Sequence, residues 1–177
     1  MRSRETRVTR GLAPRVIFVA KFGAALIVLY VIVALNPVND HVIVPFTELV
    51  AKASAAVLRM SDGGIETAGT VIHSPRFAID VRNGCNGIEA IILLCSAIIA
   101  FPATLRSRLT GLLAASVAIQ LINVVRLSSL FWLGTYQRRI FEIFHVAVWQ
   151  SLIILAAISM FVLWSLKFAE KPLVPSR

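Results

Sequence analysis

Residues 83–103 read NGCNGIEAIILLCSAIIAFPA, a polar, glycine-rich turn that runs directly into an apolar segment. Glu89 is the one charged residue between Ile88 and Ala103, so the apolar segment is a candidate for a membrane-spanning helix. A crossing takes about 20 mostly apolar residues, and this segment is somewhat short. We therefore expect the turns on either side of it to continue the helix.

The composition of the whole chain indicates a membrane protein. Hydrophobic residues make up 58% of the 177 residues, the mean hydropathy is +0.81, and 15% of the residues are charged. Soluble domains carry about 25% charged residues, so an ordinary soluble domain is excluded. Four segments are predicted to span the membrane, namely residues 16–35, 88–103, 109–125 and 144–166. We expect an all-α integral membrane protein, a four-transmembrane-helix bundle that forms a single domain over residues 1–177.

The basic residues predict how these spans are oriented, because cytoplasmic loops carry the excess of Lys and Arg. Ten of the 18 basic residues fall in three short segments, residues 1–15, 106–108 and 167–177. With four spans these segments share one face, so both termini are expected in the cytoplasm, with residues 1–15 as a basic arm. The net charge of +9 is then explained by topology and by contact with anionic headgroups. Nothing in the chain resembles a nucleic-acid-binding module.

Residues 37–84 form the sizeable segment outside the predicted spans, and we expect it on the extracytoplasmic side. Its first part has apolar side chains at helical spacing, namely Phe46, Leu49, Val50, Ala53, Val57 and Met60. This pattern predicts an amphipathic helix in the membrane interface or against the bundle. Apolar and polar residues then alternate over residues 65–72 and 76–82, with a turn signal at 73–75. That alternation predicts a small β-hairpin.

Three polar residues lie at ends of apolar spans, and their predicted depths agree. At about 1.5 Å per helical residue, the separations from cytoplasmic basic residues are about 31 Å for Cys85 to Arg106, about 27 Å for Arg126 to Arg108 and about 33 Å for His145 to Lys167. All three are close to the thickness of the apolar core, about 30 Å. Each residue alone has an ordinary explanation: packing, snorkelling to headgroups, or a hydrogen bond to a backbone carbonyl. Their shared depth favours a common site, because ionisable groups at membrane depth are functional candidates.

Together these residues supply the parts of acyl-transfer chemistry. The nucleophilic form of a cysteine is the thiolate, and a nearby cation or helix N-terminus lowers the thiol pKa. We expect Arg126, His145 and the helix start at Ile88 to lower the pKa of Cys85. Arg126 can bind a developing oxyanion or clamp a carboxylate or phosphate of the substrate. His145 can take the thiol proton and return it to the leaving amine. Cys95 lies deep in a predicted span and is expected to be inert.

Three motifs surround these residues in order along the chain. They are NGCNGIE at residues 83–89, NVVRL at 123–127 and FH at 144–145, the last just ahead of the final span. They resemble the C-x-G, N-x-x-R and downstream His motifs of the exosortase/archaeosortase family of membrane cysteine transpeptidases. The resemblance covers roughly residues 63–161, and the short chain is most similar to the compact exosortase H type. It implies Cys85, Arg126 and His145 as the catalytic residues.

The resemblance implies an enzyme of the bacterial cell (inner) membrane with its active site on the extracytoplasmic face. Its substrates would be exported proteins that end in a sorting signal: a short motif, a transmembrane helix and a basic cluster. The cysteine would attack near the motif, form a thioacyl-enzyme and pass the acyl group to water, a lipid amine or a surface polymer. Membrane lipids are the other expected partners. No cofactor or metal is expected, and His41, His73 and His145 lack ligand spacing.

Five further residues are candidates for supporting roles, namely Asn86, Gly87, Glu89, Asn123 and Glu142. The two carboxylates lie one helical turn from the cysteine and the histidine, where they either orient the histidine, pair with Arg126 or are simply solvated. The two asparagines either order the site or cap helices, and Gly87 permits a sharp turn with close approach of a substrate. Arg138 and Arg139 depart from the charge asymmetry: either they contact headgroups or a substrate, or the predicted loop is misplaced. Snorkelling to headgroups explains them best.

Two other functions compete with this interpretation. The first is a non-catalytic membrane scaffold or assembly factor in which Cys85 is incidental. The second is an unrelated intramembrane peptidase that cuts its substrate within the bilayer. Inhibition by a thiol-alkylating reagent added from outside the membrane would argue against the scaffold. The position of the cut in the substrate would distinguish the intramembrane peptidase.

Overall fold

The computed structural model of the protein describes residues 2–168, with side chains from Pro14 onward. The expected cytoplasmic residues Lys171 and Arg177 lie outside the described residues, and so do the side chains of the first four arginines. The helices are α1 (Arg2–Ala34), α2 (Asn36–Val38), α3 (Val44–Arg59), α4 (Ile88–Ala100), α5 (Leu105–Tyr136), α6 (Arg138–Ile143) and α7 (Trp149–Phe168). Two π-helical turns, η1 (Asn39–Ile43) and η2 (Phe144–Val148), join α2 to α3 and α6 to α7.

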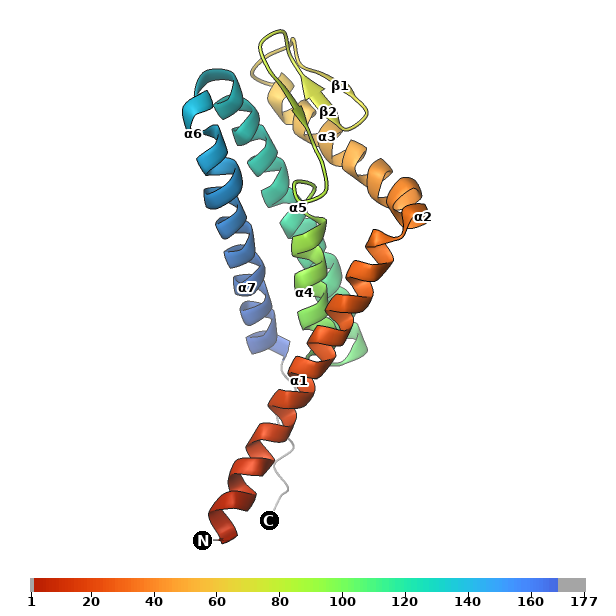
Figure 1. Cartoon of the computed structure of the whole chain (residues 1–177), viewed down its shortest axis with the longest axis vertical. Coiled ribbons are helices and arrows are strands. Elements are labelled where there is room, and N and C mark those ends of the chain that lie inside the picture. The colour runs from red at the N-terminus through yellow and green to blue at the C-terminus, as the bar shows by residue number, and fades with distance from the viewer. Residues whose placement is uncertain (1, 169–177) are drawn as a thin grey trace.

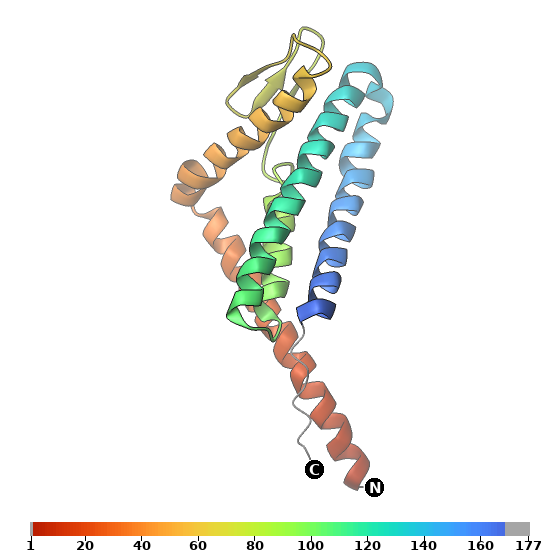
Figure 2. The same ribbon diagram turned by 180° about the vertical axis from the view of Figure 1, so that it is seen from behind.

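The long helices form an elongated bundle with the strands gathered at one end (Figure 1). We call this the sheet end, and the opposite end, at the α4–α5 connection over residues 101–104, the far end. α5 and α7 run side by side along the bundle, and α1 crosses it obliquely (Figures 1 and 2). α4 packs against α1, α5 and α7, and its Ile92, Leu94 and Ile98 are buried. The short helix α4 is therefore the centre of the bundle.

Among the described residues, four helical segments are long and apolar enough to cross a membrane, which is the predicted number but not the predicted set, because one of them falls in the segment 37–84 expected outside the spans. They are Pro14–Ala34, Asn36–Arg59, Leu105–Tyr136 and Arg138–Phe168. The predicted span at 88–103 is not among them, because α4 has only 13 residues. That length corresponds to about 20 Å of helix, against an apolar core of about 30 Å.

The expectation that flanking turns lengthen the span at 88–103 is therefore wrong. Pro102 disfavours helical geometry in the residue before it, and Phe101 has an extended ψ of 139°. The helices over the predicted spans 109–125 and 144–166 run beyond the predicted ends, because no such break interrupts them. α5 alone has 32 residues.

The strands form one antiparallel sheet in the order β1 (Glu66–Ala68), β2 (Val71–His73) and β3 (Ala78–Asp80). The predicted two-stranded hairpin is thus wrong in one respect: its first strand, 65–72, is two strands separated by a turn at Gly69. The φ of Gly69 is 60°, a left-handed conformation that glycine adopts at little cost. The second turn lies where expected, and there the Ser74 N–H donates to the Phe77 carbonyl at 2.9 Å.

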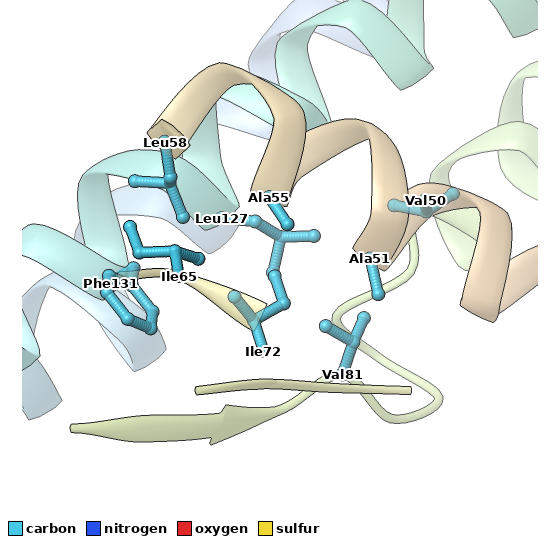
Figure 3. Packing of buried hydrophobic residues seen from close by; sticks show 9 residues of the cluster. All are labelled: Val50, Ala51, Ala55, Leu58, Ile65, Ile72, Val81, Leu127 and Phe131. Carbon is cyan, nitrogen blue, oxygen red and sulfur yellow. The ribbon is translucent and has the colours of Figure 1, made fainter. Parts of the chain in front are cut away.

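A cluster of apolar side chains holds the sheet against α3 and α5 (Figure 3). Its members are Val50, Ala51, Ala55, Leu58, Ile65, Ile72, Val81, Leu127 and Phe131. α3 thus has one buried face, but it is not the face that the sequence predicts: Leu49, Val57 and Met60 are exposed, and Val50 is the one buried residue of the predicted six. Leu127 follows Arg126 directly, and Val81 leads into residues 82–87, which we call the cysteine turn. The cluster therefore places the cysteine turn beside the middle of α5.

α5 continues well beyond the level of the cysteine turn. Arg126 lies ten residues before Tyr136, the last residue of the helix, so α5 rises about 15 Å further toward the sheet end. α6, η2 and α7 then return alongside it (Figure 2). The cysteine turn is consequently recessed below the sheet end.

Candidate active site

The cysteine turn links β3 to α4 through an unusual backbone path. The Cys85 N–H donates to the Arg82 carbonyl at 2.8 Å, which closes the turn. Gly84 and Gly87 have φ values of 90° and 80°, a region that favours glycine. A Cβ at Gly87 would lie 2.9 Å from Gln120 Nε2. We expected a substrate to approach Gly87 closely, but the group that lies close to Gly87 is α5.

One face of α5 donates hydrogen bonds to three successive carbonyl oxygens of the cysteine turn. The donors are three residues apart, so they lie on the same side of the helix. The pairs are Gln120 Nε2 to Asn86 at 3.0 Å, Asn123 Nδ2 to Cys85 at 3.1 Å and Arg126 Nη1 to Gly84 at 3.3 Å. We call these three donors the polar face of α5. Asn123 and Arg126 are only 0% and 3% exposed, so their hydrogen bonds are shielded from solvent. These bonds fix the position of the Cys85 backbone.

Cys85, Arg126 and His145 converge here from three separate elements. Cys85 Sγ lies 3.0 Å from His145 Nε2 and 3.9 Å from Arg126 Nη2. His145 belongs to η2, and its ring stacks on Phe141 with the centroids 5.6 Å apart. The structure thus brings together the three residues that the sequence analysis selected, with the Cys85 sulfur near both His145 and Arg126.

Cys85 is half-buried, and burial raises the pKa of its thiol above the usual value. Arg126 partly offsets the rise, and Glu89 adds to it. The expected lowering of this pKa is therefore wrong, because desolvation of the thiolate outweighs the neighbouring cation. A thiol with a raised pKa needs a base to become a nucleophile. His145 lies within hydrogen-bonding distance for that purpose.

Glu89 begins the first turn of α4, directly after the cysteine turn. Its Oε1 accepts a hydrogen bond from the Gly84 N–H at 2.7 Å. It also lines a cavity of about 140 Å³ together with Arg126 and Gln150 of α7. Among the described residues, no hydrogen bond joins Glu89 to His145. Its contacts therefore hold the cysteine turn rather than orient the histidine.

Glu142 is not brought to the site. Its side chain is exposed on α6, and within the described part of the chain no hydrogen bond or ion pair joins it to His145. It lines a separate hollow with Arg138 at the sheet end. Arg138 donates to the Arg76 carbonyl at 3.4 Å and lies 5.9 Å over the Phe77 ring. Arg138 therefore contacts Arg76 and Phe77 on the exposed surface of the sheet end.

Asn86 has both of the roles considered for it. Its side chain is fully buried, at 0% exposure. The amide nitrogen donates to Thr47 Oγ1 and to Asn83 Oδ1, both at 3.0 Å. The amide oxygen accepts from the Ile88 N–H at 3.1 Å. Asn86 thus caps α4 and ties the cysteine turn to α3.

The sequence analysis missed Gln120 and Thr47. Gln120 precedes Asn123 and Arg126 at a spacing of three, so polar residues at helical spacing in an apolar helix were the available signal. Thr47 gives no such signal, because its partner Asn86 is 39 residues away. Only the fold places the two side by side.

The two cysteines differ in their surroundings, although both are free thiols. Cys85 lies beside charged groups, whereas Cys95 lies in the middle of α4. Among residues 2–168, no cluster of three or more His, Cys, Asp or Glu side chains could hold a metal ion.

Comparison with known families agrees with the motifs. The chain matches the family model for transmembrane exosortases (Exosortase_EpsH) over residues 11–165, a range that contains Cys85, Arg126 and His145. No curated protein and no solved structure matches it. The assignment to the compact exosortase H type stays a prediction. With its four helices of spanning length and this match over most of its length, the chain is a multi-pass membrane protein that belongs to the transmembrane exosortase family.

Proposed function

We propose that this protein is a cysteine transpeptidase that cleaves the C-terminal sorting signal of exported proteins and transfers them to an acceptor. The observation that carries the proposal is the sulfur of Cys85, 3.0 Å from His145 Nε2 and 3.9 Å from Arg126 Nη2. A nucleophile beside a base is the arrangement that covalent catalysis requires. Family membership supports the general role in protein sorting.

The first half-reaction forms a thioacyl-enzyme. His145 Nε2 takes the thiol proton while the Cys85 sulfur attacks the carbonyl carbon of the scissile peptide bond. The carbonyl oxygen becomes an oxyanion, which the guanidinium of Arg126 stabilises. The C–N bond then breaks, and His145 gives its proton to the leaving amine. The helix of the sorting signal departs with a free amino group.

The second half-reaction releases the exported protein. An acceptor, which is water, a lipid amine or a surface polymer, attacks the thioester carbon while His145 takes its proton. Arg126 again stabilises the oxyanion. The C–S bond breaks, and the proton on His145 returns to the Cys85 thiolate. The enzyme is thereby regenerated without an oxidant or a reductant.

Both termini are assigned to the cytoplasm, and the site to the extracytoplasmic face of the bacterial cell (inner) membrane. Arg106 and Arg108 lie at the far end, at the start of α5, and the cysteine turn lies at the opposite end of α4. Because basic residues mark the cytoplasmic side, this arrangement supports an extracytoplasmic Cys85.

A processing assay tests the activity. The enzyme is expressed together with tagged reporters carrying C-terminal segments from exported proteins of the same genome, each with a motif, an apolar helix and a basic cluster. We expect a reporter to be shortened just outside its helix by the wild-type enzyme and to stay intact with Cys85→Ala. If no reporter is shortened, or if the cut lies within the helix, the proposal is wrong.

Thiol labelling tests the orientation. A membrane-impermeant maleimide added from outside is expected to modify Cys85, leave Cys95 unmodified and stop reporter processing. Mass spectrometry of the two cysteine peptides measures the labelling. Modification of Cys85 only from the cytoplasmic side would overturn the assigned topology.

A further inference from the structure

Two hollows lie along one side of α4, between α1 and α7. The first, of about 270 Å³, is lined only by apolar side chains, including Phe22 of α1, Ala97 of α4 and Ile158 of α7. The second is the cavity of about 140 Å³ beside the cysteine turn. Leu93 lines both hollows. They therefore lie next to each other along α4, and we call the two together the lateral groove, which ends at the candidate active site.

The walls of the lateral groove are α1 and α7, which approach each other at the far end and diverge toward the cysteine turn (Figures 1 and 2). At the far end the rings of Phe18 and Phe161 stack with centroids 6.1 Å apart, and Phe101 packs edge-on against both. This aromatic contact closes the groove. Ile158, on one wall, is 51% exposed, so the groove is open to the side, where the bilayer lies.

The chemistry of the groove changes along its length. It is wholly apolar near Phe22 and Ile158 and becomes polar at Glu89, Arg126 and Gln150, beside the cysteine turn. A helix that leaves the membrane has the same order of surfaces, an apolar body followed by a polar peptide. Small side chains let helices approach closely in membranes, and Ala97 is one on this surface. The groove thus matches, in its order of apolar and polar surfaces, the place where a membrane helix meets the peptide outside the membrane.

We infer that the lateral groove docks the membrane-spanning helix of the protein to be cleaved. This inference rests on the proposed function, and it adds where the substrate helix binds. From Phe161 to Gln150, α7 covers about 17 Å, roughly half of an apolar core of about 30 Å. The groove therefore holds the half of the helix next to the scissile bond, which brings that bond to Cys85.

Photocrosslinking tests the location. A benzophenone side chain is placed at Phe22 or Ile158 in the Cys85→Ala enzyme, so that the reporter is bound but not consumed. We expect both positions to crosslink to the apolar helix of the reporter that the wild-type enzyme processes. Leu152 of α7 is the matched control, because it is 46% exposed against 51% for Ile158 and lines neither hollow. Crosslinks from Phe22 and Ile158 to phospholipid alone would overturn the inference.

A blocking variant tests the consequence. Ile158→Trp fills the groove and is expected to lower the initial rate of processing about tenfold at limiting reporter, the effect of a tenfold weaker affinity. Leu152→Trp should process at the wild-type rate. The rate at which iodoacetamide alkylates Cys85 should be the same in both variants, since the site itself is unaltered. Equal processing by both variants would contradict the groove as the docking site.

The two proposals fail in different ways. If the wild-type enzyme shortens no reporter, the proposed function is wrong. If reporters are shortened but crosslink from Leu152 as strongly as from Ile158, the function stands and the docking site is wrong.

Discussion

The two ends of α4 are held by different kinds of contact. At the cysteine turn, the polar face of α5 donates directional hydrogen bonds to backbone carbonyls. At the far end, Phe101 packs edge-on against Phe161 and Trp164, with centroids 5.7 Å apart in each pair. Hydrogen bonds constrain direction, whereas apolar burial has no preferred direction. Under the proposed function, one end therefore orients the nucleophile, and the other only anchors the helix.

This difference separates rate from stability. A change at the cysteine turn is expected to act mainly on the chemical step, because it moves or removes groups around the sulfur. A change at the far end is expected to act on unfolding, because it removes apolar contacts far from the sulfur. The following variants test the separation from the largest expected effect to the smallest.

Cys85→Ala and His145→Ala are each expected to abolish reporter processing. Cys85→Ser should be nearly as inactive, because a hydroxyl is a far weaker nucleophile at neutral pH. The double variant should be no worse than either single one, since groups that act as a unit are not additive. Reporter processing is measured beside the abundance of the enzyme in the membrane, which should not change. Near-wild-type processing by Cys85→Ser would refute covalent catalysis.

Arg126→Lys is expected to lose most activity, by about 10²- to 10³-fold, the usual loss for one oxyanion donor. Arg126 contacts the Gly84 carbonyl and the Cys85 sulfur through two different nitrogens, and a lysine offers only one point of contact. The measurement is kcat at equal membrane abundance. Full activity in Arg126→Lys would remove the arginine from the mechanism and leave Cys85 and His145 as a dyad.

Asn123→Ala and Phe101→Leu compare the two ends directly. Asn123→Ala frees the Cys85 carbonyl and should lower kcat about ten- to a hundredfold, because small misplacements of a reacting group are costly. Phe101→Leu should leave kcat unchanged and lower the midpoint of thermal unfolding by a few degrees. Both quantities are measured on both variants. A lower kcat in Phe101→Leu with unchanged stability would show that the two ends are not separate.

The smallest expected effect is on the pH dependence of Cys85 alkylation. Because burial raises the pKa of this thiol, its alkylation by iodoacetamide should increase with pH around a midpoint above that of a free cysteine, about 8.5. Glu89→Gln removes a negative charge that adds to the rise, so the midpoint should move to lower pH. Glu142→Gln is the control and should leave it in place. A midpoint in Glu89→Gln at or above the wild-type value would contradict the assigned cause.

The sequence was sufficient to select Cys85, Arg126 and His145 as a group. In a membrane protein the position along an apolar helix translates into depth, so residues distant in sequence can be assigned to one level. The same reasoning could not find Thr47, whose place beside Asn86 depends on how α3 folds back on the bundle. Which helices lie side by side at a given depth is decided by packing, and the periodicity of apolar residues in the sequence does not reveal it.

Burial and helix ends were the other sources of error. The direction of the pKa shift at Cys85 depends on how far the thiolate is desolvated, and no sequence pattern measures that. The length of α4 was overestimated because hydropathy continues through Phe101 and Pro102 while the backbone leaves the helix. The division of the predicted strand at Gly69 is a similar case. The alternation of apolar and polar residues continues through Gly69, but its positive φ turns the backbone and ends the strand there.

Because the cysteine turn is recessed, a substrate needs a minimum number of extended residues between its folded part and the scissile bond. α5 rises about 15 Å above Arg126, and an extended chain covers at most about 3.3–3.6 Å per residue. Under the proposed function, the folded part of an exported protein must therefore stand at least four or five residues upstream of the scissile bond, or it collides with the sheet end. Reporters whose spacer is shortened one residue at a time should lose processing abruptly near that length. Under the proposed function, the height of α5 therefore selects substrates with a flexible tail and excludes those whose folded domain reaches the membrane.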